Sequence, residues 1–394
     1  MKHVAILLDG KIKNDGRVRH TIESLSDWHK VDLYCVGSEN DYQSLFNKNV
    51  KVIHYKMNLN WININLRMDK KFKGLRKSYL KNKNNYDFIW VNDYPLLSTG
   101  VFLKAKTGGR LIYDSHEIYI ETINQFFPQK GWKALYGKPL ISFNRCFHSR
   151  MEKKHLKYVD QMITVCDSLK IHFESIYPIN NVMVIKNCPK NVKTFENKNL
   201  IRQFLKIDSR HKILLYQGDV NLSRGINKIA EAMKYVDENI HFVIIGDGTK
   251  LIEYKNKYQS ANIHFMGKVD FNELYSYTAS ANVGISIIEP YNLSKKYSLP
   301  NKVFEYMSAG IPIITNNLPE ASKIIKEANC GFVIDDSTSK SIAKAINEIF
   351  LKEDLAKFGQ RGFNAVVNKY NWETETKKML EYIEKQTLNS ILSK

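Results

Sequence analysis

The chain has no long hydrophobic run. Across its 394 residues no window approaches the roughly 18 consecutive apolar residues that a membrane-spanning helix requires. The apolar run near the start, His3–Leu8, is too short for a secretory signal peptide and instead predicts a first strand. We therefore expect a cytoplasmic protein.

The cysteine and histidine patterns that mark disulfide or metal sites are also lacking. The five cysteines are odd in number and scattered, and they include no CxxC pair, which argues against a disulfide framework and against a zinc site. The eleven histidines include no HExxH motif and no dense cluster. We expect no bound metal and no resident cofactor.

What the chain has in excess is positive charge, with a formal net charge of +19 at pH 7. Residues 1–190 hold 31 Lys and Arg against 17 Asp and Glu (+14), and the remainder holds 28 against 23 (+5). A basic first half suggests an anionic partner, either a membrane surface, a nucleic acid or a phosphorylated substrate. The high Lys and Asn content is also typical of an AT-rich genome, and that explanation stays open.

Short apolar runs alternate with longer helical patterns along the chain, which predicts an α/β fold with parallel sheets covered on both faces. The polar segment Asn187–Arg210 separates two such series, and the length suffices for two domains. We predict an N-terminal domain over 1–188, a C-terminal domain over 189–371, and a last helix at about 372–394 that packs back on the first. Ligands bind beyond the carboxyl ends of parallel strands, so we expect a site in a central cleft. The predicted strands are His3–Leu8, Val31–Val36, Phe88–Val91, Arg110–Tyr113, Gln161–Val165, Val182–Ile185, Lys212–Tyr216, His241–Ile245, Ile263–Phe265, Val283–Ile287 and Ile311–Thr315.

The most informative segment is YSLPNKVFEYMSAGIP at 297–312. Pro300-Asn301 predicts the start of a helix and Gly310 its end. The free N–H groups and partial positive charge of a helix N-terminus suit a phosphate, and Lys302 adds a full charge. Glu305, one turn further, is placed to accept hydrogen bonds from paired sugar hydroxyls. An ordinary capped helix between a loop and a strand is the alternative.

Other loops at strand ends carry glycine or polar residues. Gly218 permits close approach of the backbone to a ligand, and Arg224 offers a forked donor for phosphate oxygens. Gly246 follows another strand, although a glycine turn alone is a weak signal. In the first half, Asp114, His116 and Glu117 form a polar cluster suited to acid–base or hydroxyl-positioning chemistry, or to a purely structural role. The candidate segments are YQGDVNLSRG at 216–225, IGDG at 245–248, MGKV at 266–269 and YDSHE at 113–117.

Taken in order, these segments resemble a retaining glycosyltransferase of the GT-B fold, glycosyltransferase family 4. The resemblance extends over nearly the whole chain and includes DGRVR at 15–19, VIKNCP at 184–189 and YNW at 370–372. It implies two Rossmann-like domains, an acceptor site in the first and a nucleotide-sugar donor site in the second. The proline-asparagine-lysine variant at 300–302 resembles a branch that acts in bacterial surface-polysaccharide assembly.

The resemblance also implies roles for single residues. Glu305 corresponds to the second glutamate of the family's glutamate–seven residues–glutamate motif, which contacts the ribose. The implied catalytic residues are His116, Arg224 and Lys302. The implied donor-binding residues are Gly218, Arg224, Gly246, Gly267, Lys268, Pro300, Asn301, Lys302 and Glu305. The implied acceptor-side residues are Asp15, Gly16, Arg17, Asp114 and Glu117.

Two positions depart from the family pattern. The first glutamate of that motif falls at Tyr297, and the usual arginine of the first phosphate loop is Asp219. Lys302 is expected to supply the missing charge. Without a carboxylate at position 297, front-face attack by the acceptor hydroxyl fits the residues better than a protein nucleophile.

The leading interpretation is a metal-independent, hexosyltransferase-type enzyme. It would move a sugar from a nucleoside-diphosphate sugar to a hydroxyl of a lipid-linked or polymeric acceptor. A nucleotide-sugar epimerase of the same architecture and a non-catalytic subunit of a polysaccharide-assembly complex are the alternatives; the departure at Tyr297 favours the latter. Asn58–Lys83 and Phe126–Tyr158 interleave aromatic residues with cations and predict a surface that lies on anionic lipid at the inner face of the cell membrane. Their apolar residues could instead be buried. We expect no nucleic-acid partner.

Overall fold

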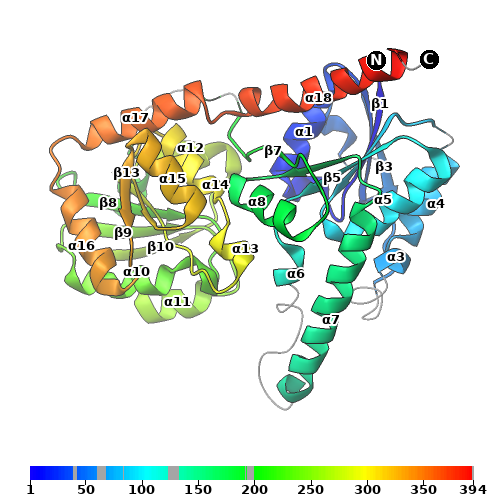
Figure 1. Cartoon of the computed structure of the whole chain (residues 1–394). Coiled ribbons are helices and arrows are strands. Elements are labelled where there is room, and N and C mark those ends of the chain that lie inside the picture. The colour runs from blue at the N-terminus through cyan, green and yellow to red at the C-terminus, as the bar shows by residue number, and fades with distance from the viewer. Residues whose placement is uncertain are drawn as a thin grey trace. The chain divides into compact units, whose positions relative to one another are not determined.

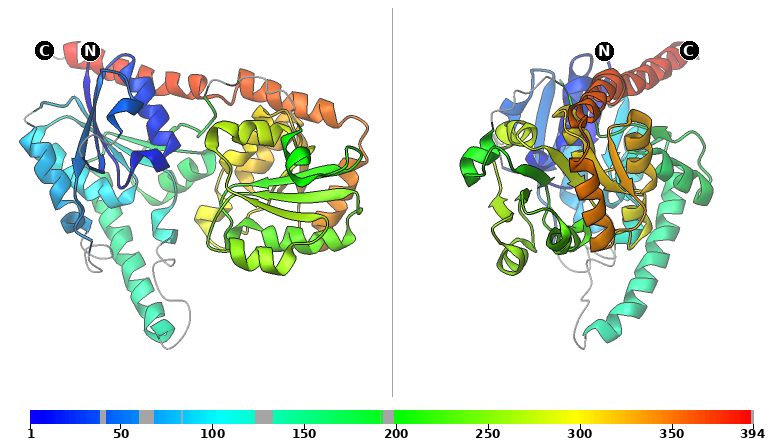
Figure 2. Two further views of the ribbon diagram at one scale, coloured as in Figure 1. Left: turned by 180° about the vertical axis from the view of Figure 1, so that it is seen from behind. Right: turned by 90° about the vertical axis from the view of Figure 1, so that its left-hand side faces the viewer.

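The computed structural model describes residues 1–38, 42–59, 68–82, 84–122, 133–190, 192 and 199–392. Within them the chain forms two compact units, Met1–Asn187 with Thr376–Lys394, and Cys188–Glu375. Each unit is an α/β layer structure with helices on both faces of a parallel sheet (Figures 1 and 2). No helix in the described part is long and apolar enough to cross a membrane.

The first unit contains a seven-stranded parallel sheet in the order β3-β2-β1-β4-β5-β6-β7. Its strands are β1 (His3–Leu7), β2 (Lys30–Val36), β3 (Val50–Tyr55), β4 (Phe88–Asn92), β5 (Arg110–Ser115), β6 (Gln161–Thr164) and β7 (Met183–Val184). Its helices are α1 (Gly16–Ser26), α3 (Met68–Lys71), α4 (Lys73–Lys81), α5 (Tyr94–Thr107), α6 (Tyr119–Thr122), α7 (Lys133–Leu156) and α8 (Asp167–Ile176). The strand order reverses between β1 and β4, where such sheets place their ligands.

The second unit repeats this plan with a six-stranded parallel sheet in the order β10-β9-β8-β11-β12-β13. Its strands are β8 (Lys212–Gln217), β9 (Ile240–Ile245), β10 (Ile263–Gly267), β11 (Val283–Ser286), β12 (Ile313–Asn316) and β13 (Gly331–Ile334). Its helices are α9 (Leu200–Leu205), α10 (Ile226–Ala232), α11 (Leu251–Tyr258), α12 (Phe271–Ala279), α13 (Leu293–Lys296), α14 (Asn301–Ser308), α15 (Pro319–Ala328), α16 (Ser339–Phe350) and α17 (Leu355–Asn368). Here the reversal lies between β8 and β11.

The last helix, α18 (Trp372–Leu392), begins in the second unit and continues in the first. Its start is fixed by Trp372, whose backbone N–H donates to the Pro189 carbonyl at 2.9 Å. Further along, Thr376 Oγ1 and Ser24 Oγ are 3.3 Å apart, and Lys378 Nζ donates to the Val184 carbonyl. The break expected near residues 370–372 therefore separates α17 from α18.

The fold class predicted from the sequence is confirmed, and the apolar runs match the strands to within a few residues. Strands β3 and β13 were not predicted. The polar separator Asn187–Arg210 is not merely a connection, because it contains α9. Ile201 on α9 is fully buried in the core of the second unit, so this segment begins that unit's hydrophobic core.

Candidate functional site

The polar residues singled out from the sequence gather at the carboxyl ends of the strands, in one group per unit. The group in the first unit follows β1, β4 and β5, and the group in the second follows β8, β9 and β10 and includes the start of α14. Each group lies where parallel sheets of this topology bind ligands.

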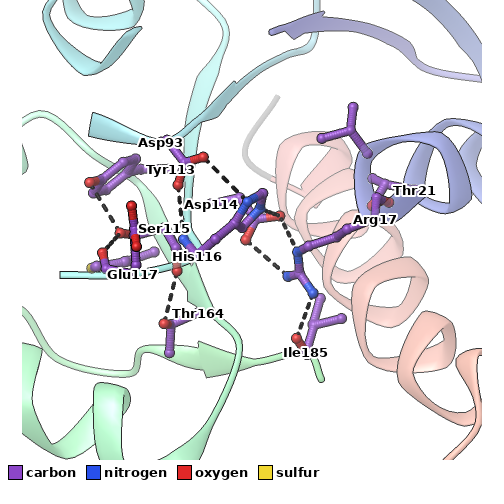
Figure 3. A network of polar contacts seen from close by, with 12 residues as sticks. Arg17, Thr21, Asp93, Tyr113, Asp114, Ser115, His116, Glu117, Thr164 and Ile185 are labelled. Atoms are coloured by element: carbon purple, nitrogen blue, oxygen red, sulfur yellow. Dashed lines mark hydrogen bonds and ion pairs between the residues drawn. The ribbon is translucent and has the colours of Figure 1, made fainter. Parts of the chain in front are cut away.

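The group in the first unit is a connected network around Asp114, the residue before the last of β5 (Figure 3). Arg17 Nη2 donates to Asp114 Oδ1 at 2.9 Å, and Arg17 Nε donates to Asp114 Oδ2 at 3.3 Å. Arg17 Nη1 donates to the Ile185 carbonyl at 2.8 Å. Arg17 and Asp114 are 4% and 1% exposed, so this ion pair is buried.

His116 lies between two carboxylates in the same network. Its Nδ1 is 3.3 Å from Asp93 Oδ2, and its Nε2 is 3.6 Å from Asp114 Oδ2. Burial alone would lower the pKa of His116, but the Asp93 and Asp114 carboxylates outweigh burial and raise that pKa to about 10. At neutral pH the imidazole is therefore protonated, and its Nε2–H has no hydrogen-bond acceptor among the described residues. This geometry favours a charged donor that positions a ligand oxygen, and it disfavours a general base.

The opposite shift holds for Asp114. Burial would raise the pKa of its carboxyl, but Arg17 and His116 hold that pKa well below its usual range. At neutral pH Asp114 is therefore ionised beside the protonated His116.

Asp93, which follows β4, was missed in the sequence. Its backbone has φ 63° and ψ 161°, a conformation that non-glycine residues rarely adopt. This backbone directs Oδ1 to the His116 N–H at 3.0 Å, while the Asp93 N–H donates to the Asp114 carbonyl at 2.8 Å. The available signal was the polar pair Asn92-Asp93 directly after a buried strand at the sheet reversal.

The structure assigns structural contacts to other predicted acceptor-side residues. Asp15 is the N-cap of α1, and its Oδ1 accepts from the Val18 N–H at 2.9 Å. Gly16 is the first residue of that helix, and the side chain of Arg17 is used in holding Asp114 and the Ile185 carbonyl. Glu117 lies in the same loop as His116, and its carbonyl accepts from Ser115 Oγ at 3.1 Å. Acceptor binding by these residues stays a prediction.

In the second unit the helix predicted at Pro300-Asn301 is α14, with Pro300 as its N-cap. Lys302, in its first turn, is only 8% exposed. Its Nζ lies over the Tyr216 ring, 3.6 Å from the centroid, and a Cβ at Gly218 would lie 3.6 Å from that Nζ. Within the described residues Lys302 forms no hydrogen bond or ion pair. Burial and the nearby Arg224 charge hold the Lys302 pKa well below its usual value.

Glu305 lies one turn along α14 and accepts a hydrogen bond from Gln217 Nε2. Gln217 Oε1 in turn accepts from Thr278 Oγ1 at 2.7 Å, so two residues that the sequence reading overlooked orient the carboxylate. Burial raises the Glu305 pKa, although Gln217 and Lys302 partly oppose the shift. The signal for Gln217 was a polar residue at the end of an otherwise apolar strand.

The predicted glycines bring three strand ends together. A Cβ at Gly246 would lie 1.8 Å from the Gly218 carbonyl oxygen, so only glycine fits there. The Gly246 N–H donates to the Gly267 carbonyl at 2.8 Å, and Gly267 has φ 77°. Lys268, directly after Gly267, is exposed.

The two departures from the family pattern also have defined places. Asp219 Oδ2 is 3.8 Å from Arg224 Nη2, so the acid lies beside the predicted phosphate-binding cation. Arg224 keeps a buried Nε without a hydrogen-bond partner among the described residues. Tyr297 ends the short helix α13, three residues before the N-cap Pro300 of α14.

The arrangement can be compared with known proteins. Residues 197–364 match the family described as glycosyl transferases group 1. An uncharacterized glycosyltransferase of Methanocaldococcus jannaschii is 24% identical over 373 residues, which are 89% of this chain and 88% of that protein. The lipopolysaccharide 1,2-N-acetylglucosaminetransferase of Salmonella typhimurium is 23% identical over 56% of this chain and 61% of that enzyme.

A solved structure of Anabaena HepE in complex with UDP and glucose aligns with a TM-score of 0.74 at 14% identity, over 98% of this chain and 100% of that one. The two parallel-sheet units therefore have the GT-B fold. The match to the glycosyl transferases group 1 model lies within the second unit.

Proposed function

We propose that the protein is a retaining glycosyltransferase of the hexosyltransferase type. It moves a sugar from a nucleoside-diphosphate sugar to a hydroxyl of a lipid-linked or polymeric acceptor in cell-surface polysaccharide assembly. The observation that carries the proposal is Lys302, a nearly buried amine in the first turn of a helix that forms no hydrogen bond or ion pair in the described part. Burying an unpaired charge is costly, and a bound diphosphate would offset that cost.

The surrounding residues suit the rest of such a donor. Arg224 offers an unpaired Nε–H beside Lys302, and the carboxylate of Glu305 is held by Gln217 for paired hydroxyls of a ribose. The glycines at 218, 246 and 267 leave the strand ends free of side chains that would block a base or a phosphate. The UDP complexes of HepE support a nucleotide sugar as the class of donor.

In the proposed reaction the acceptor hydroxyl attacks the anomeric carbon on the face that the diphosphate leaves. The bond from the anomeric carbon to the diphosphate oxygen breaks as the new glycosidic bond forms, and a phosphate oxygen takes the hydroxyl proton. Arg224 and Lys302 stabilise the negative charge that grows on the departing diphosphate. The protonated imidazole of His116 positions a hydroxyl of the transferred sugar.

We propose that this chemistry needs no metal ion, since cationic side chains supply the charge. Activity should be unchanged in EDTA. Loss of activity on chelation that is restored by magnesium or manganese would contradict this part of the proposal.

The salmonella lipopolysaccharide enzyme supports the proposed assignment to cell-envelope assembly. We also propose that the first unit attaches the protein peripherally to the inner face of the cell membrane, where a lipid-linked acceptor resides. The predicted basic segments lie partly outside the described residues, at 60–67, 83 and 126–132.

The test is a thermal-shift screen of nucleoside diphosphates and their sugars with wild type, Glu305→Ala and, as a matched control, the exposed Glu348→Ala. Ligand binding raises the unfolding temperature by mass action, so the preferred base appears as the largest shift. Glu305→Ala should lose most of the shift and Glu348→Ala none. An unchanged shift in Glu305→Ala would remove the ribose assignment. Release of nucleoside diphosphate only with acceptor present separates transfer from epimerisation and from a non-catalytic role.

A further inference from the structure

The carboxylate of Glu305 is held on one side. Gln217 Nε2 donates to Glu305 Oε2, whereas Glu305 Oε1 forms no hydrogen bond among the described residues. An ionised carboxylate accepts hydrogen bonds at both oxygens, so Oε1 and the second lone pair of Oε2 remain available to a ligand. The direction in which Glu305 presents these oxygens therefore depends on the amide of Gln217.

The position of Gln217 itself is fixed from the backbone. The residue ends β8 and is 1% exposed, and its N–H donates to the Tyr306 hydroxyl at 3.1 Å. Tyr306 follows Glu305 on α14, so this bond ties the end of the strand to the helical turn that carries the carboxylate. The terminal amide keeps one freedom, because the last torsion of a glutamine is broad and roughly two-fold. Turning the amide over would exchange Nε2 with Oε1.

Thr278 on α12 decides between these two orientations of the amide. Its side chain is fully buried, and its Oγ1 donates to Gln217 Oε1 at 2.7 Å. The same hydroxyl lies 2.8 Å from the Leu274 carbonyl, but a hydroxyl has one proton to donate. The Leu274 carbonyl already has a donor in the N–H one helical turn later, so the proton is available to Gln217. In the reversed orientation Gln217 Oε1 would face the Glu305 carboxylate, and two acceptors would oppose each other.

Packing alone does not require these polar contacts. The four residues of β8 before Gln217 are buried and are aliphatic or aromatic, so an apolar side chain would continue the pattern. A buried amide is tolerated when both of its ends have partners, and Gln217 finds them in Thr278 and Glu305. These hydrogen bonds therefore run from α12 through β8 to the partly exposed carboxylate on α14.

We propose that Thr278 is a positioning residue, which acts through Gln217 and Glu305 and sets the preference for ribonucleoside over 2′-deoxyribonucleoside diphosphates. A carboxylate held in one orientation accepts both hydroxyls of a ribose at once, and a 2′-deoxyribose offers one of the two. A carboxylate that can turn gains less from the second hydroxyl. This inference rests on the proposed nucleotide-sugar donor and names the group that fixes its recognition.

The test is calorimetry on the full chain with UDP, ADP, GDP and CDP, each beside its 2′-deoxy form. Thr278→Val keeps the shape and removes the hydroxyl, whereas Thr278→Ser keeps the hydroxyl. Thr315→Val is the matched control, because Thr315 is a buried threonine of the same unit whose Oγ1 donates to the Ser286 carbonyl. Gln217→Met removes the donor to Glu305 and is a second, independent variant. Thermal unfolding checks that each variant folds.

We expect the wild type, Thr278→Ser and Thr315→Val to prefer the ribonucleoside diphosphate by the same factor. In Thr278→Val and in Gln217→Met this preference should fall about tenfold, mainly because the ribonucleoside form binds more weakly. A merely structural defect would weaken both forms alike. An unchanged preference in these two variants would therefore overturn the inference, even if overall affinity fell.

A double-variant cycle tests the route through Glu305. In the Glu305→Ala background, Thr278→Val should not change the preference further, because the group through which it acts is gone. A further loss of the same size in that background would overturn the inference. If the wild type binds these diphosphates without preferring ribose, the inference fails and the proposed diphosphate site stands. If the wild type binds none of them, the proposed function fails as well.

Discussion

The buried charged residues of the two units differ in whether they form ion pairs. In the first unit the cationic and anionic side chains are paired with one another at distances of 2.9–3.6 Å. They are Arg17, Asp93, Asp114 and His116. In the second unit Lys302 is nearly buried beside Arg224 and forms no ion pair among the described residues, and burial and the Arg224 charge lower its pKa. A compensated network is stable without ligand, whereas an uncompensated cation gains its partner only on binding.

This difference predicts that Lys302→Met separates stability from binding. Methionine is unbranched, is only one atom shorter than lysine and carries no charge. The ligand-free variant should therefore be at least as stable as the wild type, by up to about 1–3 kcal/mol. The shift of the unfolding temperature by nucleoside diphosphate should disappear. Both quantities come from the same thermal melts. A variant that keeps the wild-type shift would show that Lys302 does not contact the diphosphate.

Glu152 predicts a pH dependence of stability. It is 3% exposed and accepts hydrogen bonds from the hydroxyls of Tyr113 and Tyr177. Burial raises its pKa from 4.5 to about 7, although the two hydroxyls partly oppose the shift. Below pH 4.5 both the folded and the unfolded state hold the proton and no penalty arises. As pH rises from 4.5 toward 7 only the unfolded state loses this proton, so the free energy of unfolding falls. The complete loss, reached above pH 7, is on the order of 3 kcal/mol.

Glu152→Gln should remove this decline, because glutamine keeps the shape and never ionises. Urea unfolding at pH 5 and pH 8 measures the difference, with the exposed Glu348→Gln as control. If the wild type and Glu152→Gln lose the same unfolding free energy between pH 5 and pH 8, the pKa of Glu152 is not raised by folding.

At the scale of elements, the DGRVR segment at 15–19 forms the start of helix α1. Asp15 was predicted on the acceptor side from the DGRVR segment, yet its carboxylate caps α1. Asp15→Ala should therefore cost about 1 kcal/mol of stability, whereas Asp15→Asn should cost little, because asparagine caps equally well. If Asp15 also contacts the acceptor, Asp15→Asn raises the acceptor KM at unchanged stability. If the acceptor KM of Asp15→Asn is unchanged, Asp15 acts only as the N-cap of α1.

The elements also show what the sequence reveals and what it hides. Buried strands such as β1 and β8 are continuous apolar runs, and the proline, asparagine and glycine of 300–310 punctuate α14 correctly. The edge strands β3 and β13 have partly exposed residues and lack such runs. They form because their backbones pair with the neighbouring strands β2 and β12, which residue composition does not reveal. Asp93 and Gln217 were missed for a related reason, since their roles depend on strands brought together by the sheet order.

At the scale of the whole molecule, charge is the property that the fold does not explain. In residues 1–190 Lys and Arg outnumber Asp and Glu by 14, so many cations cannot be paired with an acid of this region. Some of these cations are exposed side chains on α3 and α4. Lys71 is different from its neighbours, because its Nζ is 2.7 Å from Asp9 Oδ2 and it is therefore an internal partner rather than a free surface cation.

The exposed lysines Lys70, Lys73 and Lys77 test the membrane-facing role of this charge. Each cation near an anionic lipid surface contributes about 1 kcal/mol, so replacing all three with serine should lower partitioning into phosphatidylglycerol vesicles on the order of 100-fold at low salt. Raising the ionic strength should weaken wild-type binding and narrow this gap, because salt screens exposed charges. The matched control replaces Lys30, Lys48 and Lys51, which carry the same charge elsewhere in the first unit. Equal losses in both triple variants would indicate a diffuse attraction without a preferred face, and a wild type that ignores these vesicles would direct the excess charge to a soluble acidic acceptor instead.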